Sequence, residues 1–424
     1  MVKRALAGAV VLALAGCDYL TSSFDTNEFS GDEFPILVDD SSGAIIVGVQ
    51  EAGDDAKRIA VLDVLAPWTL IDRGAAAPQA ITTTDLTVLG LRPSTGELDL
   101  PRARFVEKQV LTLHPCREPE CAVGTPIGVR PFNALIGLDS FAGDALRIRL
   151  ATDEIFILPD IAGSAERRAR VCDSVMESPF RGGGTLVIGG TELGFTNRRI
   201  ALDACIAPHP ARLLTQSARG VDALFVLSTA IGTSMIGFTA YERIRQLDPS
   251  MLPIDQLPEH TIFLPSGPVA GALATLPSIA LVSNSGSNPR APCRQMWASH
   301  LLAARDCEPG DDCPCTDAVF CGVPALVELK PPFGISVLIV PDTEPTLHAL
   351  RTELRPDRPE VDGILGTEAL AALELDIDYA HDRLLARCVD RMTCGARVAM
   401  PTREFRTYVN SCLGDMPGPI VLED

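Results

Sequence analysis

The apolar residues of this chain come in short runs that are separated by turn residues. Runs at 44–49, 58–62 and 224–227 are rich in Ile, Val, Leu and Ala, and Gly and Pro recur between such runs. Strands that are buried on both faces produce continuous apolar runs, and Gly and Pro mark their ends. The pattern therefore predicts an all-β chain of many short strands.

The same criterion predicts further strands along the whole chain. They are Ile36 to Val38, Trp68 to Ile71, Leu86 to Leu91, Arg104 to Leu113, Leu146 to Leu150, Leu186 to Ile188, Leu373 to Tyr379 and, at the end, Pro419 to Leu422. With 424 residues, the chain is long enough to form two substantial hydrophobic cores.

Two kinds of local motif recur along the chain. The apolar run 224–227 leads into Ser228-Thr229-Ala230, and a Thr233-Ser234 pair follows. Elsewhere, two segments place an apolar pair before a glycine, at Gly137 and at Gly366, and each continues into a strand-like segment. When these two segments are aligned, Leu146 matches Leu375 and Ile148 matches Ile377. The repetition predicts two homologous units.

These motifs resemble the pepsin-like and retropepsin-like aspartic peptidases. In that family, each lobe has an apolar strand leading into Asp-Thr/Ser-Gly, and a later apolar-apolar-Gly segment is threaded through the catalytic loop. The resemblance implies an all-β, two-lobed pepsin-like architecture of β-barrels with a short helix after each threaded strand. It gives Ser228 the place of the second aspartate and Ala230 the place of the glycine that follows. Asp72, after the run Trp68 to Ile71, takes the place of the first aspartate.

The resemblance also implies a damaged active site. Two carboxylates that share one proton are needed for the aspartic mechanism, and a serine cannot ionise to replace one of them. Arg73 beside Asp72 departs from the small residue of the family and, if its guanidinium lies nearby, favours the charged carboxylate. The expected residues of the cleft loops are Arg73, Gly74, Thr229, Ala230, Thr233, Gly137 and Gly366. The interpretation is an inactive member that binds peptide or protein or has a structural role; the alternative is an active endopeptidase in which Asp72 has a non-standard partner.

The first 17 residues have the features of an export signal. Lys3 and Arg4 precede a short apolar run, and Leu14-Ala15-Gly16-Cys17 follows. The last four residues resemble the bacterial lipoprotein box, which implies lipidation of Cys17 and anchoring to the cell envelope, with the inner or outer membrane left open. An ordinary signal peptide is the alternative. Residues 18–33 are polar and acidic, which predicts a flexible tether.

The predicted organisation beyond the tether has four parts. Residues 34–165 form the first lobe, 166–217 connect the lobes, 218–400 form the second lobe with a cysteine-rich insertion, and 401–424 form a C-terminal segment. A glycine run at Gly182 to Gly184 precedes a strand-like segment instead of a helix, which argues against a phosphate-binding loop and favours a turn.

Thirteen cysteines minus Cys17 leave twelve, an even number that favours disulfides in an oxidising compartment. Six cysteines are disulfide candidates. Cys116 and Cys121, and likewise Cys388 and Cys394, are close enough in the sequence to close short loops, and Cys172 and Cys205 flank the segment between the lobes. The pairing of the other six stays open: Cys293, Cys307, Cys313, Cys315, Cys321 and Cys412. Their spacing fits neither a zinc knuckle nor a calcium loop, so no metal is expected.

Charge and motif content limit the partners. The chain has 36 basic and 55 acidic residues without a basic block, which argues against nucleic acid as a partner. Six scattered histidines and the absence of nucleotide, haem and HExxH motifs predict no cofactor. The expected partners are the membrane, through a lipid on Cys17, and a peptide or protein ligand, and the body is expected to be a monomer.

Overall fold

The computed structural model describes residues 28–29, 33–39, 42–73, 80–91, 98–112, 122–125, 128–141, 145–157, 176–188, 191–207, 220–264, 267–283, 293, 325–354, 361–379, 381–389 and 393–398. Strands dominate these residues, and the helices are few and short. The predicted all-β class is therefore confirmed. In the described part of the chain, no helix is long and apolar enough to span a membrane.

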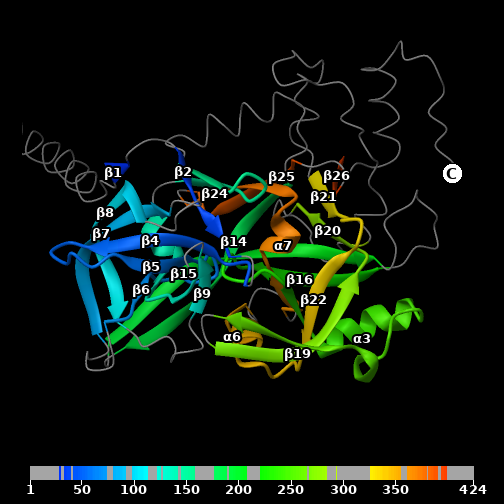
Figure 1. The fold of residues 1–424 in the computed structure, drawn as a ribbon. Helices are drawn as coiled ribbons and strands as arrows, with labels where there is room; N and C mark the ends of the chain where they lie inside the picture. The colour runs from blue at the N-terminus through cyan, green and yellow to red at the C-terminus, as the bar shows by residue number, and fades with distance from the viewer. Residues whose placement is uncertain are drawn as a thin grey trace, which may run out of the picture.

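The strands of the first lobe form an eight-stranded sheet in the described residues. Its members are β1 (Glu28–Phe29), β3 (Leu37–Val38), β4 (Ile45–Glu51), β5 (Arg58–Leu62), β6 (Leu70–Ile71), β7 (Ala80–Leu91), β8 (Leu98–Thr112) and β11 (Ala134–Ile136). A separate hairpin joins β9 (Ala122–Thr125) and β10 (Gly128–Pro131). Figure 1 shows the blue and cyan strands of this lobe at the left.

The second lobe contains most of the remaining strands. They are β15 (Thr191–Ala207), β16 (Val221–Leu227), β17 (Ser234–Gly237), β18 (Glu259–Leu264), β19 (Gly267–Leu276), β20 (Ser278–Val282), β21 (Ala325–Leu329), β22 (Ile335–Val340), β23 (Gly363–Leu365) and β26 (Cys394–Val398). The helical segments of this lobe are α3 (Phe238–Leu247), η2 (Ile254–Gln256), α6 (Pro345–Leu354) and α7 (Thr367–Leu370). In Figure 1, α3 and the strands β16, β19, β20, β21 and β22 lie at the right, in green to yellow.

A third group of strands joins the two lobes. The order β14-β25-β24-β12-β13-β2 is antiparallel throughout. These strands are β2 (Glu33–Pro35), β12 (Ala145–Arg149), β13 (Glu154–Ile157), β14 (Met176–Ile188), β24 (Leu373–Asp378) and β25 (Arg383–Cys388). The central pair is β12 and β24, the two strands that follow the glycine motifs in the sequence. β14 and β15, which lie within the predicted connection 166–217, continue this sheet into the second lobe.

The two lobes repeat one local arrangement. In the first lobe, β11 runs parallel to β5 and antiparallel to β6, and in the second, β23 runs parallel to β16 and antiparallel to β17. Each threaded strand is followed by a helical turn, η1 (Leu138–Phe141) and α7 respectively. This is the two-lobed arrangement, with short helices after the threaded strands, that the sequence motifs implied.

The apolar runs are continuous because the central strands are buried on both faces. In β4, Ile45 and Val47 contribute to one hydrophobic cluster and Ile46, between them, contributes to another. In β16, Phe225 belongs to the first of these clusters and Val226 belongs to a third. A strand with two buried faces cannot alternate polar and apolar residues, which is why the sequence shows runs instead of alternation.

Candidate functional site at the lobe boundary

Asp63 and Ser228 occupy equivalent positions in the two lobes. Asp63 follows β5, and its backbone N–H donates to Ile136 O of β11 at 3.0 Å. Ser228 follows β16, and its N–H donates to Leu365 O of β23, also at 3.0 Å. The hydrogen-bond pattern of each parallel strand pair thus places the residue after the strand at the same point of each lobe.

The glycines of the two repeated motifs lie against these loops. Gly137 N donates to the hydroxyl of Thr69 and Gly366 N donates to the hydroxyl of Ser234, both at 3.1 Å. Thr69 and Ser234 each lie six residues after the position that begins their loop. The structure therefore brings Gly137 and Gly366 to the loops, as the resemblance implied, by matching contacts in both lobes.

Asp72 does not occupy the position that the sequence interpretation gave it. Its N–H donates to Asn133 O at 2.8 Å, and the matching contact in the second lobe is Gly237 N to Asp362 O, also 2.8 Å. Asp72 is therefore equivalent to Gly237, beyond the end of β6, and Asp63 is the residue that faces Ser228. The sequence-based assignment of Asp72 is wrong because Leu70–Ile71 forms the strand after the first loop, not the strand before it.

The sequence did contain a signal for the right residue. Asp63 directly follows the apolar run 58–62, and a hydroxyl-bearing residue, Thr69, stands six positions later. Ser228 and Ser234 have the same separation. The two loops match only when they are aligned from position 63.

A hydrogen bond joins the two central residues. Ser228 Oγ donates to Asp63 Oδ1 at 2.9 Å, and the two residues are 1% and 4% exposed. The same Asp63 oxygen accepts the N–H of Leu65 at 2.9 Å and of Thr229 at 3.3 Å. Ser228 Oγ in turn accepts the N–H of Ala230 at 3.2 Å. The pair is thus a carboxyl group and a hydroxyl, held by the backbone of both loops.

Thr229 connects the loops in one direction. Its hydroxyl donates to Leu62 O at 2.7 Å and accepts the N–H of Val64 at 3.1 Å. The equivalent residue of the first lobe is Val64 itself, whose side chain cannot form hydrogen bonds. The family resemblance implied a hydroxyl in both loops, and here only the second loop carries one.

Burial raises the pKa of the Asp63 carboxyl group. Removal of the carboxyl group from solvent disfavours its charged form. Hydrogen bonds from Leu65, Ser228 and Thr229 and the charge of Arg199 favour the charged form, but their combined effect is smaller. A raised pKa gives Asp63 a larger fraction of neutral carboxylic acid than an exposed aspartate has at the same pH.

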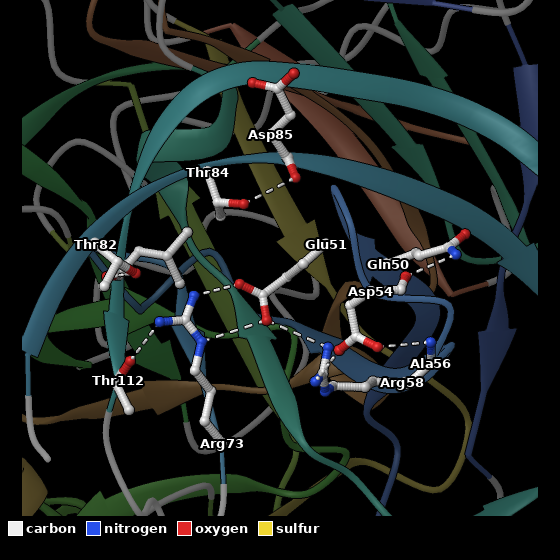
Figure 2. A network of polar contacts seen from close by, with 11 residues as sticks. Gln50, Glu51, Asp54, Ala56, Arg58, Arg73, Thr82, Thr84, Asp85 and Thr112 are labelled. Carbon is white, nitrogen blue, oxygen red and sulfur yellow. Dashed lines mark hydrogen bonds and ion pairs between the residues drawn. The ribbon is translucent and has the colours of Figure 1, made fainter. Parts of the chain in front are cut away.

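The side chain of Arg73 is held away from this pair. It forms an ion pair with Glu51 of β4 and donates to Thr112 Oγ1 at 3.1 Å (Figure 2). Glu51 also accepts from Arg58 at 3.3 Å, so one buried carboxylate lies between two guanidinium groups. This network fixes β4 to the ends of β6 and β8 within the first lobe, and Arg73 was wrongly assigned to the cleft loops.

The other predicted loop residues are distributed as follows. Thr229 and Ala230 lie beside the central pair, whereas the hydroxyl of Thr233 donates to Glu368 Oε1 at 3.4 Å. Gly74 lies outside the described residues. Among the described residues, no group of three or more His, Cys, Asp and Glu side chains is arranged to hold a metal ion.

Two disulfides are present in the described part of the chain. Cys388 and Cys394 are bonded to each other, which confirms the short loop that their spacing predicted. Cys205 is bonded to Cys293, 88 residues away, so Cys172 is not its partner. The other predicted disulfide cysteines lie outside the described residues: Cys116, Cys121, Cys172, Cys307, Cys313, Cys315, Cys321 and Cys412. The predicted signal peptide with Cys17, the tether up to residue 27 and the C-terminal segment 401–424 lie outside them as well.

The comparisons with known proteins find similarity only to solved structures, and three of these have sequence identities of 11% or less and TM-scores of 0.41 or less. No protein-family model matches the sequence, and no curated protein matches it. A solved structure with a similar fold is conglutin gamma, a basic 7S globulin from lupine seeds, with 9% identity, a TM-score of 0.41 and coverage of 85% of this chain and 95% of that one. A second is an aspartic proteinase from Irpex lacteus, with 9% identity, a TM-score of 0.38 and coverage of 87% of this chain and 99% of that one. A third is the Basic 7S globulin from soybean, with 11% identity, a TM-score of 0.36 and coverage of 85% of this chain and 95% of that one. At such identities the roles of individual residues rest on the contacts described above.

Proposed function

We propose that this protein is a non-catalytic, two-lobed module of the cell envelope that binds a peptide or protein or serves a structural role. The observation that carries the proposal is the hydrogen bond from Ser228 to Asp63 where the two loops meet. Aspartic catalysis needs one ionised carboxylate as base and one carboxylic acid to protonate the substrate. A serine hydroxyl does not alternate between these states near neutral or acid pH, so the pair lacks one of the two functions.

A peptide-cleavage assay from pH 3 to pH 7 tests the proposal. We expect that the purified wild type does not cleave the peptides, so that pepstatin has no activity to inhibit. The decisive control is Asp63→Asn, which removes the remaining carboxylate but keeps its size. Pepstatin-sensitive turnover that Asp63→Asn abolishes would establish the alternative, an active endopeptidase in which Asp63 works with a non-standard partner.

Reconstruction of the family pattern needs more than the second carboxylate. Besides Ser228→Asp, the loops depart from that pattern at Val64, Leu65 and Ala230. Val64→Thr supplies the missing hydroxyl, and Leu65→Gly and Ala230→Gly remove side chains where the family has glycine. We expect Ser228→Asp alone to stay inactive and the fourfold variant to be the smallest set able to cleave peptides. Turnover by the single variant would contradict this expectation.

The proposed location is the outside of the cytoplasmic membrane, with a lipid anchor on Cys17. The described disulfides indicate an exported protein, because the cytosol keeps thiols reduced. The lipoprotein-like sequence at 14–17 supports the anchor. Cells expressing the wild type should incorporate a fatty-acid analogue into the protein, and Cys17→Ser should abolish the labelling. Equal labelling of both proteins would exclude the anchor.

A further inference from the structure

Leu65 and Ala230 occupy equivalent positions in the two loops, two residues after Asp63 and Ser228. Leu65 packs against a hydrophobic cluster of the second lobe that includes Val226, Leu350 and Leu354. Ala230 belongs to a cluster whose other members, such as Ile46, come from the first lobe. Each loop therefore places a side chain in the opposite lobe, at the position where the family resemblance has glycine.

The backbone of the first loop is also held by the second lobe. Arg199 of β15 donates through Nη1 to Leu65 O. Its Nε and Nη2 atoms donate to the two carboxylate oxygens of Glu353 in α6, both at 2.8 Å. The side chains of Arg199 and Glu353 are each 11% exposed, and the guanidinium lies 5.4 Å from the ring centre of Phe195. Two parallel hydrogen bonds in a nearly buried setting fix the orientation of the guanidinium.

Gly182 provides the space for this ion pair. It has a φ of +73° and lies where the register of β14 and β15 shifts between Arg181 and Gly183. A Cβ atom at this position would lie 2.5 Å from Leu354 Cδ2, 3.1 Å from Glu353 Oε1 and 3.2 Å from Arg199 Cγ. The first glycine of the run 182–184 is thus required by a left-handed backbone and by close packing against the pair.

We propose that Arg199 and Glu353 form a latch that keeps the Asp63 loop closed against the second lobe. An extended polypeptide that binds along a backbone segment needs free carbonyl groups as acceptors. The latch occupies the Leu65 carbonyl, and burial of the Leu65 side chain holds the same residue from its other end. A polypeptide can bind to the Leu65 carbonyl only when the latch opens. The device does not depend on whether the Asp63–Ser228 pair is catalytic.

Trp68 provides a probe of the loop. The chain has two tryptophans, so Trp297→Phe leaves Trp68, three residues after Leu65, as the single source of indole fluorescence. In this background, Arg199→Ala should raise the acrylamide quenching constant of Trp68 about twofold or more, because the loop loses its charged donor. Arg199→Lys keeps the charge but loses the two-pronged contact, and it should give an intermediate value.

Arg351→Ala is the matched control. Arg351 lies in α6, the helix of Glu353, and its side chain is about as buried as that of Arg199. It donates to Asp342 and to Val361 O, away from the Asp63 loop. It should leave Trp68 quenching unchanged. Equal quenching in the wild-type background, Arg199→Ala and Arg351→Ala would overturn the latch.

Hydrogen exchange separates local opening from general loss of stability. In Arg199→Ala, the amides of Leu65 and Ala66 should exchange about tenfold faster, while those of β24 keep their rates. Equal acceleration in β24 would mean that Arg199 only stabilises the whole fold, and would also overturn the proposal. Gly182→Ala gives an independent check, since it should accelerate the same two amides without removing any charge.

Discussion

Arg147 and Asp376 pair with each other across the centre of the sheet that joins the lobes. Arg147 donates to the two carboxylate oxygens of Asp376 at 2.8 and 3.0 Å. The residues lie 376 − 147 = 229 positions apart, the separation of the equivalent glycines, 366 − 137 = 229. Each residue is therefore the structural equivalent of the other, and the ion pair lies where a twofold relation between the lobes would place its axis.

This pair makes stability depend on pH. Burial raises the pKa of Asp376 to about 6 in spite of Arg147, and the nearby Glu374 adds to the rise. Because the folded-state pKa lies above the ordinary value of 3.8, the ionised carboxylate is disfavoured by folding. The contribution of Asp376 to the free energy of unfolding should fall by about 3 kcal/mol as pH rises from about 4 to 7. Urea unfolding of wild type and Asp376→Asn at several pH values measures this difference.

An acid in the second lobe, Asp342, serves as a contrast. Asp342 has a lowered pKa: burial opposes its ionisation, but hydrogen bonds from Thr239 and Arg351 outweigh that effect. The contribution of Asp342 to the free energy of unfolding is therefore present above its ordinary pKa and is lost as pH falls. The stability difference between wild type and Asp342→Asn should therefore change with pH in the opposite direction to the difference between wild type and Asp376→Asn. The same pH profile for wild type and Asp376→Asn would refute the prediction for Asp376.

A second carboxylate at position 228 should destabilise the protein at neutral pH. Ser228→Asp would place two carboxyl groups at about the 2.9 Å that now separates Ser228 Oγ from Asp63 Oδ1. Like charges this close raise one pKa by roughly 2 units, which corresponds to a loss of about 3 kcal/mol as pH rises from about 4 to 7. Ser228→Asn, of the same size but neutral, should show no such loss in the same urea titration. An equal loss in both variants would point to steric misfit instead of charge.

Gly220 should tolerate no side chain. A Cβ atom there would lie 2.5 Å from Cys205 Sγ and 2.7 Å from Cys293 Sγ, so the disulfide or the backbone would have to move. Overpacking of this kind costs about 1–3 kcal/mol. Gly194→Ala is the comparison, because nothing lies within 4 Å of its Cβ position. Thermal unfolding should show a lower Tm for Gly220→Ala only, and unchanged values for both would contradict the packing argument.

Close contact between the lobes should make Gly43, like Gly220, intolerant of a side chain. Its φ is +70°, and a Cβ would lie 2.1 Å from Gly232 Cα in the loop after Ser228. Gly53 has a φ of +79° but no atom within 4 Å of its Cβ position. Alanine at either site costs about 1–2 kcal/mol of backbone strain, and Gly43→Ala should cost a further 1–3 kcal/mol, roughly, for the clash. Chemical denaturation measures both, and equal losses would rule out the clash.

The sequence by itself determined the fold class and its repetition. Apolar runs mark the buried strands, and the apolar-apolar-Gly motifs at Gly137 and Gly366 mark the two threaded strands. The matched segments 146–150 and 373–379 became the central pair of the sheet between the lobes. These features are predictable because each is a local pattern, set by burial of one strand and by the backbone space around one glycine.

Only the tertiary structure decided which acid faces Ser228. Asp63 and Asp72 both follow apolar residues, and the choice between them depends on the hydrogen-bond register of β5 against β11, which are distant in the sequence. The partner of Cys205, 88 residues away, and the contact of Arg199 with Glu353 and Leu65 depend in the same way on how separate segments pack. A short stretch of sequence specifies its own burial and turns, but it does not specify the register or the partner that it meets across the fold.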